Sequence, residues 1–301
     1  MQETVQIFEV SPRDGLQNEP RQIDTADKIH LIDLLGHCGF ENIEATSFVS
    51  PKWVPQMADA AAVMAGIVRA RPATYHVLVP NLKGLELAMD AGVDGVSVFA
   101  AATEGFSQKN INCSIKESLD RFRPVLAVAA RHRMPVRGCI SMVTDCPFEG
   151  AVDPAQVVWL AEALLDMGCY EVALGDTVGM ATPEAISRLL DALVKKISPD
   201  LLAGHYHDTG GRAVDNIRTS LDFGLRCFDA SVGGLGGCPF APGAAGNVAT
   251  ETVMAMLHEA GYDTGLNVAA IAEAAEFANS LRTPRQPAVT SMQEKSENNE
   301  S

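Results

Sequence analysis

Eight alternations of a short β-branched segment with a longer amphipathic segment run through the chain and constrain its fold more than any other feature. The strand candidates are residues 5–10, 42–46, 75–79, 95–99, 136–142, 171–174, 202–207 and 227–232. The helix candidates are residues 26–38, 57–69, 82–90, 115–133, 155–167, 183–197, 212–223 and 249–260. An uninterrupted βα repeat of this kind favours an α/β fold of the closed (β/α)8 TIM barrel type over an open doubly wound sheet.

Prolines and glycines mark the ends of several expected helices. Pro154 and Pro183 lie where the first helical turn tolerates proline, and Asp153 and Thr182 precede them as N-cap candidates. A left-handed residue is favoured just after a helix, and the glycines at such positions are Gly39, Gly92, Gly168, Gly224 and Gly261. We expect one catalytic domain over residues 1–283, including an extra helix over 267–282, and a disordered polar tail over 284–301.

Composition and charge argue against several classes of partner. The net charge of −15, from 23 basic and 38 acidic residues, disfavours nucleic acid, because phosphate binding needs clustered lysine and arginine. No apolar run approaches the roughly 18 residues of a membrane span, and no secretory signal is visible. The seven cysteines form no CxxC pair and are typical of reduced thiols. We therefore expect a cytoplasmic protein without membrane contact.

Polar residues with reactive side chains lie at or just after the ends of four of the expected strands. They are Arg13 and Asp14 after the first strand, Glu44 in the second, Asp176 after the sixth, and His205 and His207 at the end of the seventh. In a barrel enzyme the active site is located at the C-terminal ends of the strands. We therefore expect these side chains to converge on one rim.

Two histidines of the seventh strand suggest a metal site. His205 and His207 lie two residues apart, so both should point to one face, while Tyr206 points towards the helices. Such a pair can bind a metal or can simply be hydrogen-bonded. Asp14 adds a carboxylate and Asn247 an amide carbonyl, and this mixed nitrogen and oxygen set favours Mg²⁺ or Mn²⁺ over structural zinc.

Four further residues are catalytic candidates, each with a structural alternative. Arg13 could form only a surface salt bridge, but its place beside the expected metal indicates an anion-stabilising role. Glu44 and Asp176 either act directly or orient neighbouring ligands and the rim. Cys238 lies between a glycine and a proline in a glycine-rich loop. That setting suggests a proton donor or acceptor rather than an incidental thiol.

Long motifs around these residues resemble the 3-hydroxy-3-methylglutaryl-CoA lyase family. The motifs are residues 13–19 (RDGLQNE), 44–53 (EATSFVSPKW), 80–84 (PNLKG), 109–114 (KNINCS), 205–209 (HYHDT) and 234–239 (GLGGCP). The resemblance extends from the first strand to the helix after the eighth, which is nearly the whole barrel. It implies that the acyl-CoA substrate is cleaved to acetyl-CoA and acetoacetate with Mg²⁺ or Mn²⁺. It also implies a homo-oligomer, with a dimer as the expected form, and a role in leucine breakdown or ketone-body formation.

The same resemblance implies a role for each candidate residue. The implied metal ligands are Asp14, His205, His207 and Asn247. Arg13 would stabilise the thioester enolate and Cys238 would exchange a proton with the substrate, while Glu44 and Asp176 would support the metal, water or substrate. The chemistry agrees, because a retro-Claisen cleavage needs the tertiary hydroxyl deprotonated and the departing enolate stabilised.

Two departures from the family leave the acyl substrate open. Pro20 stands where some members have a basic residue, and Gly210 stands where many have tyrosine. The alternatives are therefore a related lyase for citramalyl-CoA or for a longer 3-hydroxy-3-alkylglutaryl-CoA. A Claisen-condensing synthase is disfavoured, because Leu16 and Cys238 replace the glutamates typical of those enzymes. The intact set of candidate ligands disfavours a non-catalytic metal-binding barrel.

Overall fold

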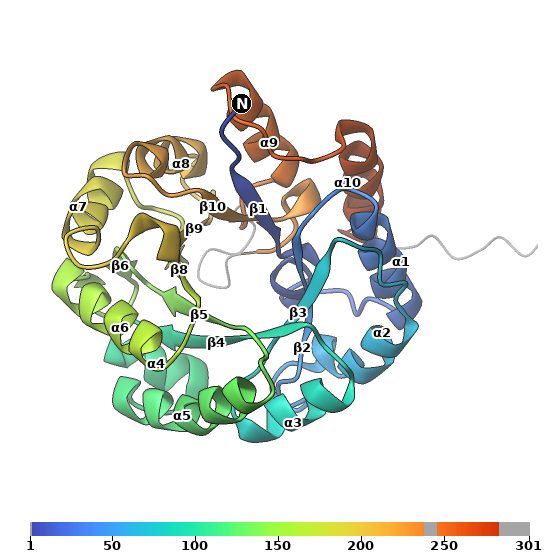
Figure 1. Cartoon of the computed structure of the whole chain (residues 1–301), viewed down its shortest axis with the longest axis horizontal. Helices are drawn as coiled ribbons and strands as arrows, with labels where there is room; N and C mark the ends of the chain where they lie inside the picture. The colour runs from blue at the N-terminus through green and yellow to red at the C-terminus, as the bar shows by residue number, and fades with distance from the viewer. Residues whose placement is uncertain (1, 238–245, 283–301) are drawn as a thin grey trace, which may run out of the picture.

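The computed structural model of the chain describes residues 2–237 and 246–282. Its eight parallel strands close into a barrel in the order β1-β10-β9-β8-β5-β4-β3-β2, which confirms the predicted (β/α)8 architecture (Figure 1). The barrel strands are β1 (Gln6–Glu9), β2 (Asn42–Ser47), β3 (Thr74–Leu78), β4 (Gly95–Ala101), β5 (Val136–Ser141), β8 (Glu171–Asp176), β9 (Leu202–Tyr206) and β10 (Cys227–Ala230). The expected tail over 284–301 lies outside the described residues.

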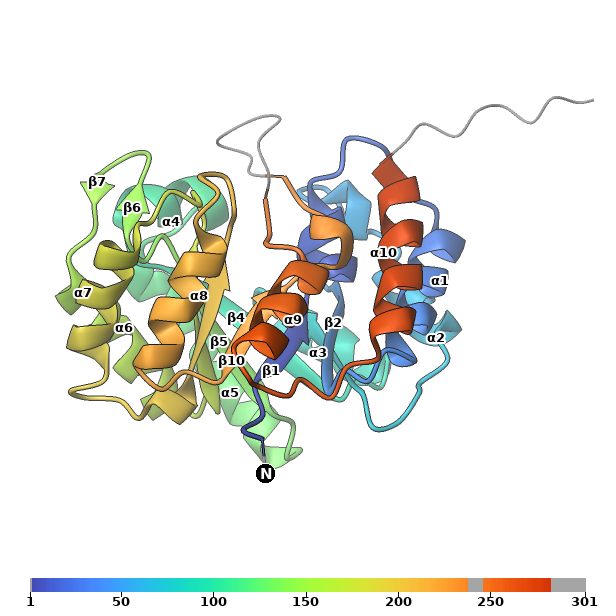
Figure 2. The same cartoon turned by 90° about the horizontal axis from the view of Figure 1, so that it is seen from above.

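Helices surround the barrel, as Figure 1 shows. The ring consists of α1 (Thr25–Gly36), α2 (Ala60–Gly66), α3 (Leu82–Asp90), α5 (Ile115–Arg131), α6 (Pro154–Asp166), α7 (Pro183–Leu193), α8 (Ala213–Asp222) and α9 (Thr250–Glu259). The extra helix α10 (Val268–Arg282) packs against α1 (Figure 2). Within the described residues, no helix is both long and apolar enough to cross a membrane.

Local signals placed several helix ends correctly. Asp153 accepts a hydrogen bond from the N–H of Ala155, and Thr182 accepts one from Ala185, so both act as N-caps. The five glycines expected after helices have φ between 67° and 108°. That left-handed region strains residues that carry a Cβ, so glycine is favoured there for a conformational reason.

Several short elements differ from the sequence predictions. Helix α2 begins at Ala60 rather than residue 57, because residues Pro55–Met57 form a 3-10 turn. Strand β10 ends at Ala230, before the 3-10 turn η4 (Val232–Gly234). Helix α4 (Glu104–Ile111) was not predicted, nor was the hairpin of β6 (Asp145–Cys146) and β7 (Gly150–Ala151). These short elements follow β4 and β5 and are stabilised by a small apolar cluster of their own, which the long-range periodicity does not reveal.

The interior of the barrel combines apolar and charged side chains. Phe8, Val10, Ala173, Ala203 and Cys227 form a small apolar cluster that is separate from the large core between the strands and the helices. Arg137 is only 1% exposed, with its guanidinium carbon 4.1 Å from the centre of the Phe8 ring. The charged part of this interior lies next to the candidate site described below. The N-terminus lies at the end of the barrel opposite the strand-to-helix loops (Figure 2).

Candidate metal centre and active site

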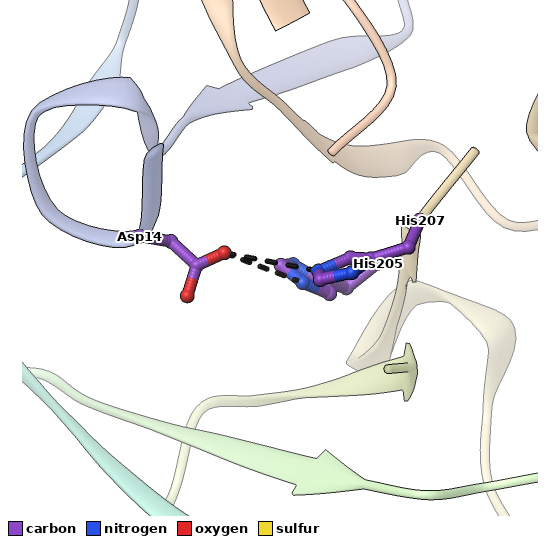
Figure 3. Close-up of side chains that lie close together, drawn as sticks. All are labelled: Asp14, His205 and His207. Atoms are coloured by element: carbon purple, nitrogen blue, oxygen red, sulfur yellow. Dashed lines mark ion pairs between the residues drawn. The ribbon is translucent and has the colours of Figure 1, made fainter. Parts of the chain in front are cut away.

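Asp14, His205 and His207 bring three potential metal ligands together at the C-terminal rim of the barrel (Figure 3). The nearest nitrogens of His205 and His207, Nε2 in both, lie 4.0 and 3.8 Å from Oδ2 of Asp14. One ligand atom from each residue lies within 4.8 Å of the other two. Protein ligands bind divalent cations at about 2.0–2.2 Å, so donors of one ion lie roughly 3–4 Å apart. The spacing therefore fits a shared cation.

The alternation of side chains along β9 and the residue that follows it produces the histidine pair. His205 and His207 face the barrel mouth with ring centroids 5.3 Å apart. Tyr206 points the other way, and its hydroxyl lies 2.8 Å from Oγ of Ser220 on α8. This arrangement confirms the orientation predicted from the two-residue period of a strand.

Asp14 is held by a turn that sequence patterns did not reveal. The five residues of η1 (Ser11–Gly15) form a π-helical turn directly after β1. The turn brings the Asp14 carboxylate towards His205 and His207 (Figure 3). Burial alone would raise the pKa of Asp14, but Arg13 and the two histidines hold that pKa well below its usual value. The site therefore presents a carboxylate anion to any bound cation.

Asn247 reaches the same group from the segment before α9. The residue is buried, its backbone bridges to that of His207, and its Nδ2 donates to Oδ2 of Asp14 at 2.8 Å and to the carbonyl oxygen of Leu235 at 3.3 Å. Rotation of the amide by half a turn would present Oδ1 instead, the atom that hard cations prefer. The position of Asn247 thus fits a fourth ligand.

Arg13 is buried among carboxylates rather than exposed in a surface salt bridge. Its Nε donates to Oε2 of Glu44 at 2.5 Å, and its Nη1 donates to Oδ1 of Asp14 at 2.6 Å. Burial would lower the pKa of Arg13, but Glu44 and Asp14 raise it above its ordinary value. Arg13 is therefore a fixed cation beside the candidate metal ligands, and Glu44 sets the orientation of its guanidinium.

Asp176 is directed at the backbone of its own loop. Its Oδ1 accepts the N–H of Gly179 at 3.0 Å and its Oδ2 accepts the N–H of Ala181 at 2.9 Å. Burial raises the pKa of Asp176 in spite of these bonds, which lower it. Its backbone carbonyl also accepts the N–H of His207 at 3.3 Å. These contacts favour the role of orienting the rim over direct participation.

The loop that carries Cys238 lies outside the described residues from position 238 to 245, so the role of that thiol stays a prediction. The described ends of this loop pass close to Asn247. A Cβ on Gly236, whose φ is 113°, would lie 2.8 Å from Nδ2 of Asn247. Glycine is therefore needed at this position both for its backbone angle and for the close approach.

Charged residues beneath the histidines were not predicted from the sequence. Asp229 on β10 lies 3.0 Å from Nδ1 of His205, and Arg137 on β5 pairs with both Asp229 and Glu171. The one sequence feature that could have indicated them is that Arg137, Glu171 and Asp229 are charged residues within segments that otherwise fit buried strands. The register, in which Asp229 is opposite His205, decides that these groups meet.

Comparisons with known proteins agree with this geometry. A sequence model of the HMGL-like family matches residues 4–278. The 3-hydroxy-3-isohexenylglutaryl-CoA/hydroxy-methylglutaryl-CoA lyase of Pseudomonas aeruginosa is 54% identical over 272 residues, which cover 90% of this chain and 91% of that protein. The crystal structure of the HMG-CoA lyase from Brucella melitensis is similar at a TM-score of 0.92 and 56% identity, covering 93% of this chain and 99% of that one. An HMG-CoA lyase from Acinetobacter baumannii in complex with coenzyme A and 3-methylmalate is similar at a TM-score of 0.88 and 36% identity, covering 97% of this chain and 96% of that one.

Proposed function

The chain belongs to the HMGL-like family, and we propose that it is a divalent-metal-dependent lyase that cleaves 3-hydroxy-3-methylglutaryl-CoA to acetyl-CoA and acetoacetate. The observation that carries this proposal is the convergence of Asp14, His205 and His207 at the barrel rim, beside the buried guanidinium of Arg13. The names of the similar proteins support the substrate. The coenzyme A complex of a structural relative supports a thioester substrate.

The chemistry of the donor set supports Mg²⁺ or Mn²⁺ as the cofactor. Asp14, His205 and His207 would hold the ion, and Asn247 would join them through Oδ1 after rotation of its amide. The carboxylate of Asp14 and the amide oxygen of Asn247 are donors that suit Mg²⁺ and Mn²⁺, and the described part of the site contributes no thiolate that would favour zinc. When bound, the cation stabilises negative charge on the substrate oxygens as a Lewis acid.

The residues of the chain account for the remaining steps of the cleavage. Transfer of the C3 hydroxyl proton to a water molecule allows the C2–C3 bond to break. The C3–O bond becomes the ketone of acetoacetate, and the electrons of the C2–C3 bond move into a thioester enolate. Arg13 meets that developing charge, because Glu44 and Asp14 hold its Nε and Nη1 and leave Nη2 as the proposed donor to the thioester oxygen. Cys238 then supplies the proton that converts the enolate carbon into the methyl group of acetyl-CoA.

A longer substituent at C3 is a second candidate for the substrate. The name of the Pseudomonas aeruginosa relative includes a 3-isohexenyl as well as a 3-methyl substrate. Gly210 supplies no side chain beside the loop that contains Met180. We therefore propose that the pocket also accepts a C3 group larger than methyl. A cytoplasmic location, a homodimer and a role in leucine breakdown or ketone-body formation belong to the same proposal, and their support is the family resemblance.

A panel of thioesters tests both candidates. The chain is assayed for acetyl-CoA release from 3-hydroxy-3-methylglutaryl-CoA, citramalyl-CoA and longer 3-alkyl analogues, with added Mg²⁺ or Mn²⁺ and after treatment with EDTA. We expect metal-dependent cleavage of the methyl substrate. Full activity after EDTA and dialysis would refute the metal assignment, and cleavage of citramalyl-CoA alone would replace the proposed substrate.

Substitution of one ligand tests the site itself. His207→Ala should retain the fold but lose most of its activity and its affinity for Mn²⁺, because the cation contributes several kcal/mol of charge stabilisation. His258→Ala is a matched control, since this histidine lies in the last turn of α9 with its Nε2 3.0 Å from Oγ1 of Thr264. Equal Mn²⁺ binding by the two variants would contradict the ligand role of His207.

A further inference from the structure

A carboxylate from the neighbouring strand contacts the far side of one histidine ring. Nδ1 of His205 lies 3.0 Å from Oδ2 of Asp229, while Nε2 of the same ring lies 4.0 Å from Oδ2 of Asp14. The ring therefore lies between two carboxylates, one at the barrel rim and one deeper in the interior. The side chain of Asp229 is only 4% exposed, so solvent does not compete for this contact.

Arg137 fixes the plane of the Asp229 carboxylate from the opposite side. Its Nη1 donates to Oδ2 at 3.0 Å and its Nη2 donates to Oδ1 at 2.7 Å, a two-point contact that lysine cannot reproduce. The guanidinium is fixed in turn, because its Nε donates to Oε1 of Glu171 at 2.7 Å and its face lies on the Phe8 ring. Asp229 therefore has little freedom to rotate.

These contacts determine which nitrogen of His205 can donate. Both oxygens of Asp229 accept hydrogen bonds from Arg137, so the carboxylate serves as an acceptor throughout. A neutral imidazole that contacts this acceptor must carry its proton on Nδ1, and its Nε2 then has a free lone pair. That lone pair faces the side of the ring where Asp14 lies.

We propose that Asp229, fixed by Arg137, is a positioning residue that holds His205 in the tautomer and orientation needed to bind the metal through Nε2. This inference rests on the proposed metal-dependent function and identifies residues that orient one of its metal ligands. A carboxylate behind a metal-binding histidine fixes the ring and increases its basicity as a ligand. Glu171 acts one step further away, because it contacts Arg137 rather than Asp229.

The tautomer of His205 can be measured without any turnover. Long-range ¹⁵N–¹H correlation spectra of the full chain, labelled in histidine and kept at about pH 8, where an ordinary imidazole is neutral, show which nitrogen carries the proton. His205→Gln assigns the signal. We expect wild-type His205 to carry its proton on Nδ1 in the metal-free chain. A neutral ring whose only proton lies on Nε2 would overturn the proposal, because that nitrogen could not bind a cation.

Two variants that each remove one negative charge distinguish a positioning role of Asp229 from a purely electrostatic role. Asp229→Asn should shift His205 towards the Nε2–H tautomer and weaken Mn²⁺ binding by about 10–100-fold, the usual effect of losing such a partner. Glu171→Gln removes the same charge from the same buried cluster but leaves the Asp229–Arg137–His205 contacts in place. We expect it to lower stability while its tautomer and Mn²⁺ affinity stay close to those of the wild type.

The possible results distinguish the inference from the proposed function. A wild-type chain that binds Mn²⁺ and cleaves the thioester, with an Asp229→Asn variant that binds Mn²⁺ equally well, overturns only the positioning role. A wild-type chain that binds no Mn²⁺ overturns the metal centre and the positioning role together. If Asp229→Asn does not fold, the wild-type tautomer and the milder variant Arg137→Lys decide the question. That variant retains a cation but loses the two-point contact, so it should also weaken Mn²⁺ binding.

Discussion

Replacement of Glu9 by glutamine should remove part of the pH dependence of the protein's stability. Glu9 lies on β1 and is fully buried. Its Oε1 accepts the N–H groups of Ser11 and Val232 at 2.9 and 3.1 Å, and its Oε2 accepts the hydroxyl of Thr250 at 2.7 Å. The side chain thus joins the turn that carries Asp14 to the loop after β10 and to the start of α9.

Burial raises the pKa of Glu9 from the ordinary 4.5 to about 7, in opposition to these hydrogen bonds, which lower it. A carboxyl whose pKa is raised in the folded state binds its proton more tightly there than in the unfolded chain. Its contribution to stability is therefore complete below about pH 4.5 and is lost as the pH rises through about 7. At about 1.4 kcal/mol per pH unit the whole loss is about 3 kcal/mol, of which about 2.5 kcal/mol falls between pH 5 and pH 8.

Glu9→Gln removes the titration while its shape and contacts are retained. The amide oxygen can accept the two backbone N–H groups, and the amide nitrogen can donate to the hydroxyl of Thr250. Urea unfolding of both proteins at several values between about pH 5 and about pH 8 gives the free energy of unfolding of each. We expect the variant to gain about 2.5 kcal/mol relative to the wild type across this interval. Other titrating groups cancel in that difference.

An exposed substitution of the same kind, Glu86→Gln on α3, is the matched control for the chemical change. A Glu9→Gln difference that is independent of pH would refute the reasoning. That result would show that the three hydrogen bonds outweigh burial, so that Glu9 is an anion across the whole interval.

Two predictions concern the active site directly. Cys238→Ser should lower kcat by roughly 10²–10⁴ with a smaller effect on KM, because a positioned acid or base contributes about that much; a Cys238→Ala variant that turns over like the parent would assign the proton transfer to another group. Gly210→Tyr should narrow the range of accepted C3 substituents more than it harms the methyl substrate, since pockets separate such groups by about 1–3 kcal/mol per methylene. A Cβ at position 210 would lie 3.0 Å from the carbonyl oxygen of Gly179 and 3.3 Å from the sulfur of Met180. The tyrosine side chain would therefore pack directly against the loop that contains these two residues. Undetectable cleavage of larger analogues by the parent, or an unchanged ratio of kcat/KM values in the variant, would contradict this second prediction.

Local patterns were sufficient for the architecture and for the convergence of three candidate ligands. The βα repeat predicted the barrel, and glycines after helices were correctly interpreted because each left-handed position is a local requirement. The two-residue period of a strand predicted that His205 and His207 face together. Since all strands of a parallel barrel end on one rim, the approach of Asp14 to this pair also followed from sequence.

Short elements were harder to predict, because their stability depends on neighbours that are distant in the chain. Helix α4 has a weakly amphipathic sequence, and its Phe106 is buried in a cluster with Met142 and Cys146, which come from the next unit of the barrel. The π-helical turn that orients Asp14 carries no pattern that distinguishes it from an ordinary loop. Tertiary packing decides both.

The sequence by itself determined which residue types stand at the ends of the strands, and only the tertiary structure decided which charges became partners. Arg13 is buried because Glu44 on the neighbouring strand β2 accepts its Nε. Asp229 contacts His205 because β10 pairs with β9 in the register that places these two residues opposite each other. Closure of the barrel lets Arg137 on β5 reach Asp229 across the interior. Side-chain periodicity reports which face a residue occupies, whereas an ion pair depends on register and barrel closure, which are properties of the whole sheet.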